Sequence, residues 1–404
     1  MKQKNITLIA SERMTSMSNI LREDSFIRFP NKVRIELQLD LENNISIGRD
    51  NKILKVLKVN RAYVEDAHKF KKIKENNIGF VTNRTHQFIN GGKGILWIEK
   101  HEATEVITIG ADPEFLFMDD EKTARYAADI AYENPYENFS LLSPLGSDGP
   151  CGEIRPEPNI KTEKVKDSIR DIIDEYSNKD FLNKYIWKVL AYFKGKINYT
   201  TMPIDREVST GGHVHISLPK YLLDKKLSNE YKYTLYKNIT KILDHYIAVP
   251  LLRLEDDDVL KRRENCYYGR AGDVRYSDDR FEWRTPSGIW LSDPKYAQGV
   301  LSTAQDVAAW AYNNLAPEKG EHTIDALNKI IKEIFPEGEL DASAELINNN
   351  NPSDISKKEY YKLFKRLKTI CSDISISYIE PLFSMQRKEF KKLQKRDLRQ
   401  IWLE

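Results

Sequence analysis

Apolar and polar side chains alternate at every second position in several short segments, which is the pattern of a half-buried β-strand. The sequence VRIELQLDL at Val33–Leu41 is one such run, and strand-like pieces follow at Gly79–Val81 and Ile95–Ile98. We therefore expect a small α+β module in the first 105 residues.

Two longer segments place their apolar residues three or four positions apart, as in an amphipathic helix. The pattern predicts helices that pack against a sheet rather than helices that hold a cofactor. The two apolar stripes are Val165, Ile169, Ile172, Ile173 and Tyr176, and Leu235, Ile239, Ile242, Leu243 and Tyr246.

The length of 404 residues favours one large catalytic domain with smaller appendages. We predict an N-terminal module over residues 1–105, a catalytic domain over 106–317 and a helical C-terminal extension over 318–404. The extension ends in a basic run from Arg387 to Arg399, typical of a solvated helix face.

Four strand-like segments carry charged residues at spacing two, and this spacing gathers the charges on one face of each strand. In GADPEFLF, Asp112 and Glu114 share a face while Phe115 and Phe117 occupy the other. Taken alone, each such segment is equally well an amphipathic strand with its polar side in water. The four together predict a polar site built on a sheet.

The second and third of these segments add acids and histidines. In CGEIRPE, Glu153 and Arg155 share a face, and Glu157 joins them only if the strand continues past the intervening proline. In GGHVHIS, His213 and His215 lie on one side, and the flanking glycines admit a ligand to the backbone.

The fourth segment, RFEWR, places Arg280, Glu282 and Arg284 on one face, with Phe281 and Trp283 behind them. Carboxylates clustered in one cavity repel one another unless cations neutralise them, which favours Mg²⁺ or Mn²⁺. The interleaved arginines suit phosphate oxygens. Since neither a Walker loop nor a GxGxxG fingerprint is present, metal ions and side chains must hold the phosphates.

At these four motifs the sequence resembles the glutamine synthetase and glutamate–cysteine ligase superfamily, and within it the phage-encoded type 2 carboxylate–amine ligases. The resemblance spans about Val106 to Leu315. It implies an α+β fold in which a curved, mainly antiparallel sheet forms a funnel-shaped active site flanked by helices. The metal ligands that it implies are Asp112, Glu114, Glu153, His213 and Glu282.

The resemblance also implies roles for the basic residues. Arg280 and Arg284 would contact the phosphates of ATP and the acyl-phosphate, with Arg155 and His215 as further contacts to the nucleotide. The loop NCYYGRAGDVR is similar to a family loop beside the carboxylate substrate, which makes its two arginines the substrate-binding candidates. These are Arg270 and Arg275.

The activity that follows is ATP-dependent formation of an amide bond through an acyl-phosphate, with two or three divalent ions and with Glu157 as a candidate general base. Three alternatives remain open. The same fold supports phosphoryl transfer to guanidino groups, a metal-dependent hydrolase would use the HVH motif with the acids, and a binding or structural protein would retain only the pocket.

The amino-acid composition limits the classes of partner that we expect for this protein. The formal net charge of +2 provides no field that would select nucleic acid or a membrane surface. Three scattered cysteines build no disulfide framework, and no run reaches the roughly 20 apolar residues of a membrane span. We expect a cytoplasmic enzyme, in the host cytoplasm if phage-encoded. It would act on a carboxylic acid and an amine that the sequence does not identify. A peptide or protein substrate remains open, and so does a homo-oligomer.

Overall fold

A computed structural model describes residues 107–404, apart from 141–142, 226, 256–258, 319, 336–337, 350–355 and 386, and seven strands within residues 1–106. Contacts along the chain divide it into two compact units, Met1–Val106 and Ile107–Glu404. Each unit is described by itself below. The predicted division into three parts stays a prediction.

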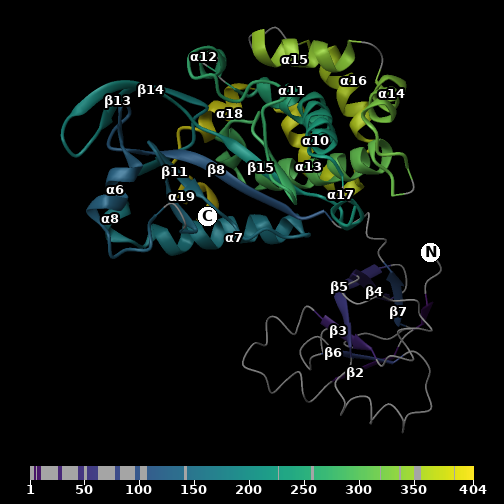
Figure 1. Ribbon diagram of the computed structural model, residues 1–404. Helices are drawn as coiled ribbons and strands as arrows, with labels where there is room; N and C mark the ends of the chain where they lie inside the picture. The colour runs from purple at the N-terminus through teal and green to yellow at the C-terminus, as the bar shows by residue number, and fades with distance from the viewer. Residues whose placement is uncertain are drawn as a thin grey trace. The chain divides into compact units, whose positions relative to one another are not determined.

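The first unit contains a mixed seven-stranded sheet in the order β1-β7-β4-β5-β3-β6-β2 (Figure 1). The predicted strand pieces at Gly79–Val81 and Ile95–Ile98 fall on β6 and β7, with Phe80 and Val81 fully buried. The predicted strand at Val33–Leu41 lies outside the described residues. The strands are β1 Lys4–Asn5, β2 Thr7–Ala10, β3 Phe26–Phe29, β4 Asn44–Arg49, β5 Lys52–Arg61, β6 Ile78–Val81 and β7 Leu96–Lys100.

The second unit is built around a mostly antiparallel open sheet whose central strand is β8. The sheet runs β14-β13-β9-β8-β15-β17-β16, and β11 and β12 also pair with β8 while β10 pairs with β11. Its strands are β8 Ile109–Met118, β9 Thr123–Arg125, β10 Leu145–Asp148, β11 Cys151–Ile154, β12 Ile186–Lys188, β13 Tyr192–Asn198, β14 Pro203–Ser209, β15 Gly212–Ser217, β16 Val274–Tyr276 and β17 Arg280–Trp283.

Helices cover one face of this sheet (Figure 1). They include α6 Ala127–Glu133, α7 Thr162–Ser177, α8 Asp180–Asn183, α9 Lys220–Leu223, α10 Asn229–Leu243, the π-helix η2 Asp244–Ala248, α11 Val249–Leu252, α12 Val259–Glu264, the 3-10 helix η3 Gly288–Ser292 and α13 Pro294–Leu315. After these come α14 Ile324–Ile334, α15 Glu339–Asn349, α16 Lys357–Leu367, α17 Asp373–Ser384, α18 Arg387–Leu393 and α19 Leu398–Leu403. Within the described residues, no helix has both the length and the apolar composition needed to cross a membrane.

The main hydrophobic core lies between the sheet and these helices. From β8 it receives the odd-numbered side chains, among them Phe115 and Phe117, and both predicted helical stripes are buried in it. The α+β class and the two stripes are therefore confirmed. The even-numbered Leu116 and Met118 enter a smaller core under β13 and β14, so the other face of β8 is left to Asp112 and Glu114.

The C-terminal helices share the main core with the residues before them. Leu327, Ile347 and Ile379 belong to the same buried cluster as α7 and α10. Within the basic run, Phe390 is buried and Arg399 pairs with Asp397. Trp402, buried on α19, donates from Nε1 to the carbonyl oxygen of Leu291 over 2.8 Å, so the end of the chain supports the segment that follows β17.

We predict that Trp402→Ala lowers the free energy of unfolding by about 3–5 kcal/mol, because it removes a large buried ring and leaves a carbonyl without its donor. Urea unfolding followed by circular dichroism measures this. Tyr132→Ala is the control, since that side chain is 82% exposed, and its effect should stay within about 0.5 kcal/mol. A Trp402→Ala effect as small as the control's would contradict the assignment of α19 to the core.

Candidate active site

Strand register explains how the predicted acids and histidines meet. His213 lies opposite Asp112 on β8, and His215 lies opposite Glu282 on β17. On the other edge of β8, Glu153 lies opposite Glu114. Since side chains opposite one another in a ladder point to the same face, all of these residues project from the face that the main core does not use.

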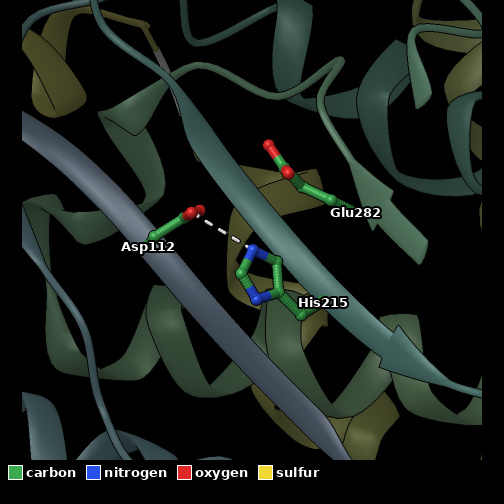
Figure 2. A group of neighbouring side chains, drawn as sticks. All are labelled: Asp112, His215 and Glu282. Carbon is green, nitrogen blue, oxygen red and sulfur yellow. Dashed lines mark hydrogen bonds and ion pairs between the residues drawn. The ribbon is translucent and has the colours of Figure 1, made fainter. Parts of the chain in front are cut away.

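A first group consists of Asp112, His215 and Glu282, whose potential ligand atoms all lie within 4.8 Å of one another. Figure 2 shows the three side chains converging from neighbouring strands. Asp112 Oδ2 lies 3.1 Å from His215 Nε2. Two oxygen donors and one imidazole match the ligands that Mg²⁺ and Mn²⁺ accept.

His213 lies next to this group and contacts two of the same carboxylates. Its Nδ1 is 3.1 Å from Asp112 Oδ1 and 3.2 Å from Glu282 Oε1, and the ring is 3% exposed. The sequence predicted His213 as the ligand and His215 as a neighbour. The structure brings both within reach, so we name Asp112, His213, His215 and Glu282 the Asp112 group.

The histidines determine the charge state of Asp112. Burial alone would raise the pKa of Asp112, but the hydrogen bonds and charge interactions with His213 and His215 together outweigh burial and hold it well below its ordinary value. Burial lowers the pKa of His215, but the hydrogen bond to Asp112 and the charges of Asp112 and Glu282 together outweigh burial, so the pKa of His215 is raised. Asp112 is thus an ionised carboxylate, as a cation ligand must be.

A second group, named the Glu114 group, consists of Glu114, Asp148 and Glu153. Burial raises the pKa of Glu114, which His213 and the N–H of Gly211 counteract. That N–H donates to Glu114 Oε2 over 2.6 Å. Three carboxylates in one group repel one another, and their all-oxygen set could hold a hard divalent ion.

Asp148 was missed by the sequence reasoning. It is the last residue of β10, at the turn that leads into β11, and Asp before Gly149 and Pro150 is ordinary turn chemistry. The short β10–β11 hairpin brings it beside Glu153. The sequence does contain a signal, because Asp148 lies three positions before Cys151, where the predicted acidic strand begins. The spacing of two that identified the other acids does not include Asp148.

Gly211 has to be a glycine at this point of the site. A Cβ atom at this position would lie 2.2 Å from His213 Nε2 and 2.7 Å from the hydroxyl of Tyr268. The hydrogen bond from the Gly211 N–H to Glu114 requires the backbone to come equally close to these side chains. The glycine pair before the HVH motif therefore admits neighbouring side chains to the backbone, as well as any ligand.

Tyr268 is the second residue that sequence reasoning missed. Its hydroxyl lies 3.1 Å from Glu114 Oε1 and 2.5 Å from His213 Nε2, so it contacts both groups. It comes from the loop between α12 and β16, where Tyr267 has a φ of 53° and Gly269 a φ of 67°. The loop was selected for its arginines, and no periodicity identifies which of its side chains points inward.

Of the predicted arginines, Arg284 is the one most enclosed by the site. Its Nε lies 3.1 Å from Glu282 Oε1, and its guanidinium lies over the Tyr268 ring, 5.1 Å from the centroid. Arg275 is exposed and pairs with Glu282 Oε2 at 3.2 Å. Arg280 is exposed beside Asp279, and Arg270 lies over the exposed Tyr267 ring. The structure therefore gathers Arg284 and Arg275 at Glu282.

Arg155 and Glu157 differ from the arrangement expected for them. Arg155 pairs with Glu153 and donates to the carbonyl oxygens of Ser143 and Ser147, over 3.1 and 3.4 Å, so it supports the β10–β11 hairpin. β11 ends at Ile154, before the proline, and Glu157 is exposed with its N–H bonded to Ser168. Because the strand ends there, Glu157 joins neither acidic group, and its role as a base is without structural support.

One buried atom tests whether the Asp112 group fits a cation. Glu282 Oε1 is buried and makes no well-aligned hydrogen bond to any described residue, although His213 and Arg284 lie near it. A buried carboxylate oxygen without an aligned donor is costly unless another group completes its surroundings. The donor set and this oxygen both fit a divalent ion.

A buried carboxylate on the opposite face of the sheet connects two segments that carry site residues. Asp244, the first residue of η2, accepts from Trp283 Nε1 over 2.8 Å and from the N–H of Gly272 over 2.6 Å. It thus joins β17 to the loop that carries Tyr268. Burial raises the pKa of Asp244 to about 6 despite these hydrogen bonds.

Comparison with known families finds a match over most of the second unit. The model of the family described as phage phiEco32-like COOH.NH2 ligase-type 2 matches residues 109–403. The match begins where β8 begins and includes every strand that carries the site. It also continues through the C-terminal helices, well beyond Leu315, where the resemblance seen in the sequence stopped. A search of curated proteins found no match.

Asp244→Asn should change how stability depends on pH. Because the pKa of Asp244 is raised from 3.8 to about 6 on folding, the folded state retains a proton that the unfolded chain has lost, and stability falls as the pH rises through this window. Asparagine does not titrate. Relative to Asp244→Asn, wild type should lose about 2 kcal/mol between pH 4 and pH 7, since one pKa unit corresponds to about 1.4 kcal/mol.

Urea unfolding at several pH values measures this difference. Asp341→Asn is the matched control, because that carboxylate is 79% exposed, and its curve should run parallel to that of wild type. Parallel curves for Asp244→Asn and wild type would show that the buried carboxylate is not perturbed.

Proposed function

The chain belongs to the phage phiEco32-like COOH.NH2 ligase-type 2 family, and from this we propose that it is an ATP-dependent carbon–nitrogen ligase that joins a carboxylic acid to an amine. The observation that carries the proposal is the convergence of two acidic groups, two histidines and Arg284 on one face of an antiparallel sheet. We propose that this sheet is the curved wall of a glutamine-synthetase-like funnel.

Two divalent ions, Mg²⁺ or Mn²⁺, would lie in the two groups. Asp112, Glu282 and His213 or His215 would hold one, and the Glu114 group the other. When bound, the ions supply positive charge that offsets the charge of the phosphates.

Arg284 is proposed to contact the phosphoryl group during transfer. It is half-buried, and its guanidinium is oriented by Glu282, Asp273 and the Tyr268 ring. A planar guanidinium held in this way offers two parallel N–H donors to phosphate oxygens. Arg280, on the same face near the exposed end of β17, is proposed as a further phosphate contact.

Arg275 and Arg270 are proposed to bind the carboxylate substrate. Both are exposed, and Arg275 reaches the site through Glu282. Attack of the substrate carboxylate on the γ-phosphorus of ATP would form an acyl-phosphate and release ADP. Attack of a neutral amine on the acyl carbon would then expel phosphate and leave an amide, with the amine's proton passing to a base.

The alternative activities would use fewer of the residues that are gathered at the site. A metal-dependent hydrolase needs the acids and a histidine but has less need of Arg284 held at the metal groups. Transfer to a guanidino nitrogen would use the same phosphate contacts and differs only in the acceptor. The chemical distinction is whether an activated acid forms.

Hydroxylamine trapping tests the acyl-phosphate directly. With ATP, Mg²⁺ and a pool of candidate acids, wild type should form a hydroxamate in step with ADP, because an acyl-phosphate reacts with any strong nucleophile. Arg284→Lys should lower the rate by about 100-fold, since an ammonium does not reproduce the planar fork. Arg396→Lys, on a surface pair with Glu404, serves as the control and should match wild type.

ADP release across the acid pool without hydroxamate would refute the acyl-phosphate and favour a phosphotransferase. Hydroxamate formation independent of ATP would instead indicate a hydrolase.

A further inference from the structure

The hydroxyl of Tyr268 lies between the two acidic groups and contacts one member of each. It is 3.1 Å from Glu114 Oε1 in the Glu114 group and 2.5 Å from His213 Nε2 in the Asp112 group. A phenol carries one hydrogen, so it donates to one of these two atoms at a time. Which atom receives the hydrogen depends on the state of His213.

Without a cation, the Nδ1 atom of His213 faces two carboxylate oxygens, from Asp112 at 3.1 Å and Glu282 at 3.2 Å. Carboxylates only accept, so in the neutral imidazole the ring hydrogen belongs on Nδ1. Nε2 is then an acceptor, and it takes the hydrogen of the Tyr268 hydroxyl. In this state Glu114 Oε1 receives no hydrogen from Tyr268.

With a cation held by the same carboxylates, Nδ1 must offer its lone pair, and the ring hydrogen moves to Nε2. Nε2 now donates to the phenol oxygen. The hydrogen of the phenol therefore turns to Glu114 Oε1. The two states differ only in the direction of two hydrogen bonds that the geometry already provides.

We infer that Tyr268 couples the two metal groups, because a cation in the Asp112 group directs the phenol hydrogen to Glu114. The N–H of Gly211 already donates to Glu114 Oε2 over 2.6 Å, so the phenol hydrogen on Oε1 completes the hydrogen bonds that hold this carboxylate in position as a ligand. Filling the first group therefore favours filling the second. The inference rests on the proposed function, and specifically on His213 as a ligand.

The surroundings of Tyr268 keep its hydroxyl in place. The guanidiniums of Arg262 and Arg284 lie over its ring, 5.0 and 5.1 Å from the centroid. Gly269 leaves room for Arg262, because a Cβ there would lie 1.9 Å from its Nη1. Burial, together with the charge of Glu114, raises the pKa of Tyr268 well above its ordinary value, so the phenol keeps its hydrogen.

Titration of the full-length protein with Mn²⁺ alone, without nucleotide, tests the coupling. Electron paramagnetic resonance counts the free ions. Wild type should bind two ions cooperatively, with the second about tenfold tighter than it would be without the first, which is the size of effect that a partner of a metal-bound histidine has on affinity. Tyr268→Phe keeps the ring and removes the hydroxyl, so it should bind two ions independently.

Tyr267→Phe is the matched control. It removes a hydroxyl from the adjacent, exposed ring of the same loop and should retain the cooperativity of wild type. Cooperative binding in Tyr268→Phe, or independent binding in wild type, would overturn the coupling and leave the ligase proposal standing. Failure of wild type to bind Mn²⁺ would overturn both.

A second measurement follows His213 in wild type, and a variant serves only to assign its signal. Nitrogen-15 spectra of the seven histidines, with His213 assigned through His213→Gln, report which ring nitrogen carries hydrogen. Addition of Mg²⁺ should move the hydrogen of His213 from Nδ1 to Nε2. A ring that keeps the same tautomer with and without Mg²⁺ would contradict the inference.

Discussion

Repulsion among carboxylates on one face of a sheet is the constraint on which the other features of this site depend. Asp112, Glu114, Glu153 and Glu282 are all held at least partly out of water, with Asp148 beside them. Each would be protonated or expelled if nothing opposed its charge. Histidines, arginines, backbone N–H groups and the Tyr268 hydroxyl offset part of this charge. The remainder is what a pair of divalent ions would neutralise.

The parts of the site on regular strands could be predicted from sequence, because a strand fixes side-chain direction at a period of two. Asp112, Glu114, His213, His215 and Glu282 were all placed on the correct face for this reason. Their roles as ligands stay predictions. The α+β class was implied by the family resemblance and agrees with the alternation and the helical stripes. The funnel shape stays a prediction, because it would depend on sheet curvature that no local pattern encodes.

The parts on turns and loops could not be predicted, since tertiary contacts decide where such side chains point. Asp148 has the sequence context of an ordinary turn, and Tyr268 reaches the site only because the backbone at Tyr267 and Gly269 takes positive φ values. Glu157 was expected on the face of Glu153 only if the strand continued past Pro156, and β11 ends at Ile154. The role of Glu157 as a base stays a prediction. Behind the sheet, the bonds of Asp244 to Trp283 and Gly272 align β17 with the loop, and the sequence gives no sign of them.

We propose that the two acidic groups hold two divalent ions, and anomalous diffraction from crystals grown with Mn²⁺ and a non-hydrolysable ATP analogue tests this proposal. Two manganese peaks are expected, one bounded by Asp112, Glu282 and a histidine, and one bounded by Glu114, Asp148 and Glu153. With the analogue bound, the absence of manganese at both positions would contradict it.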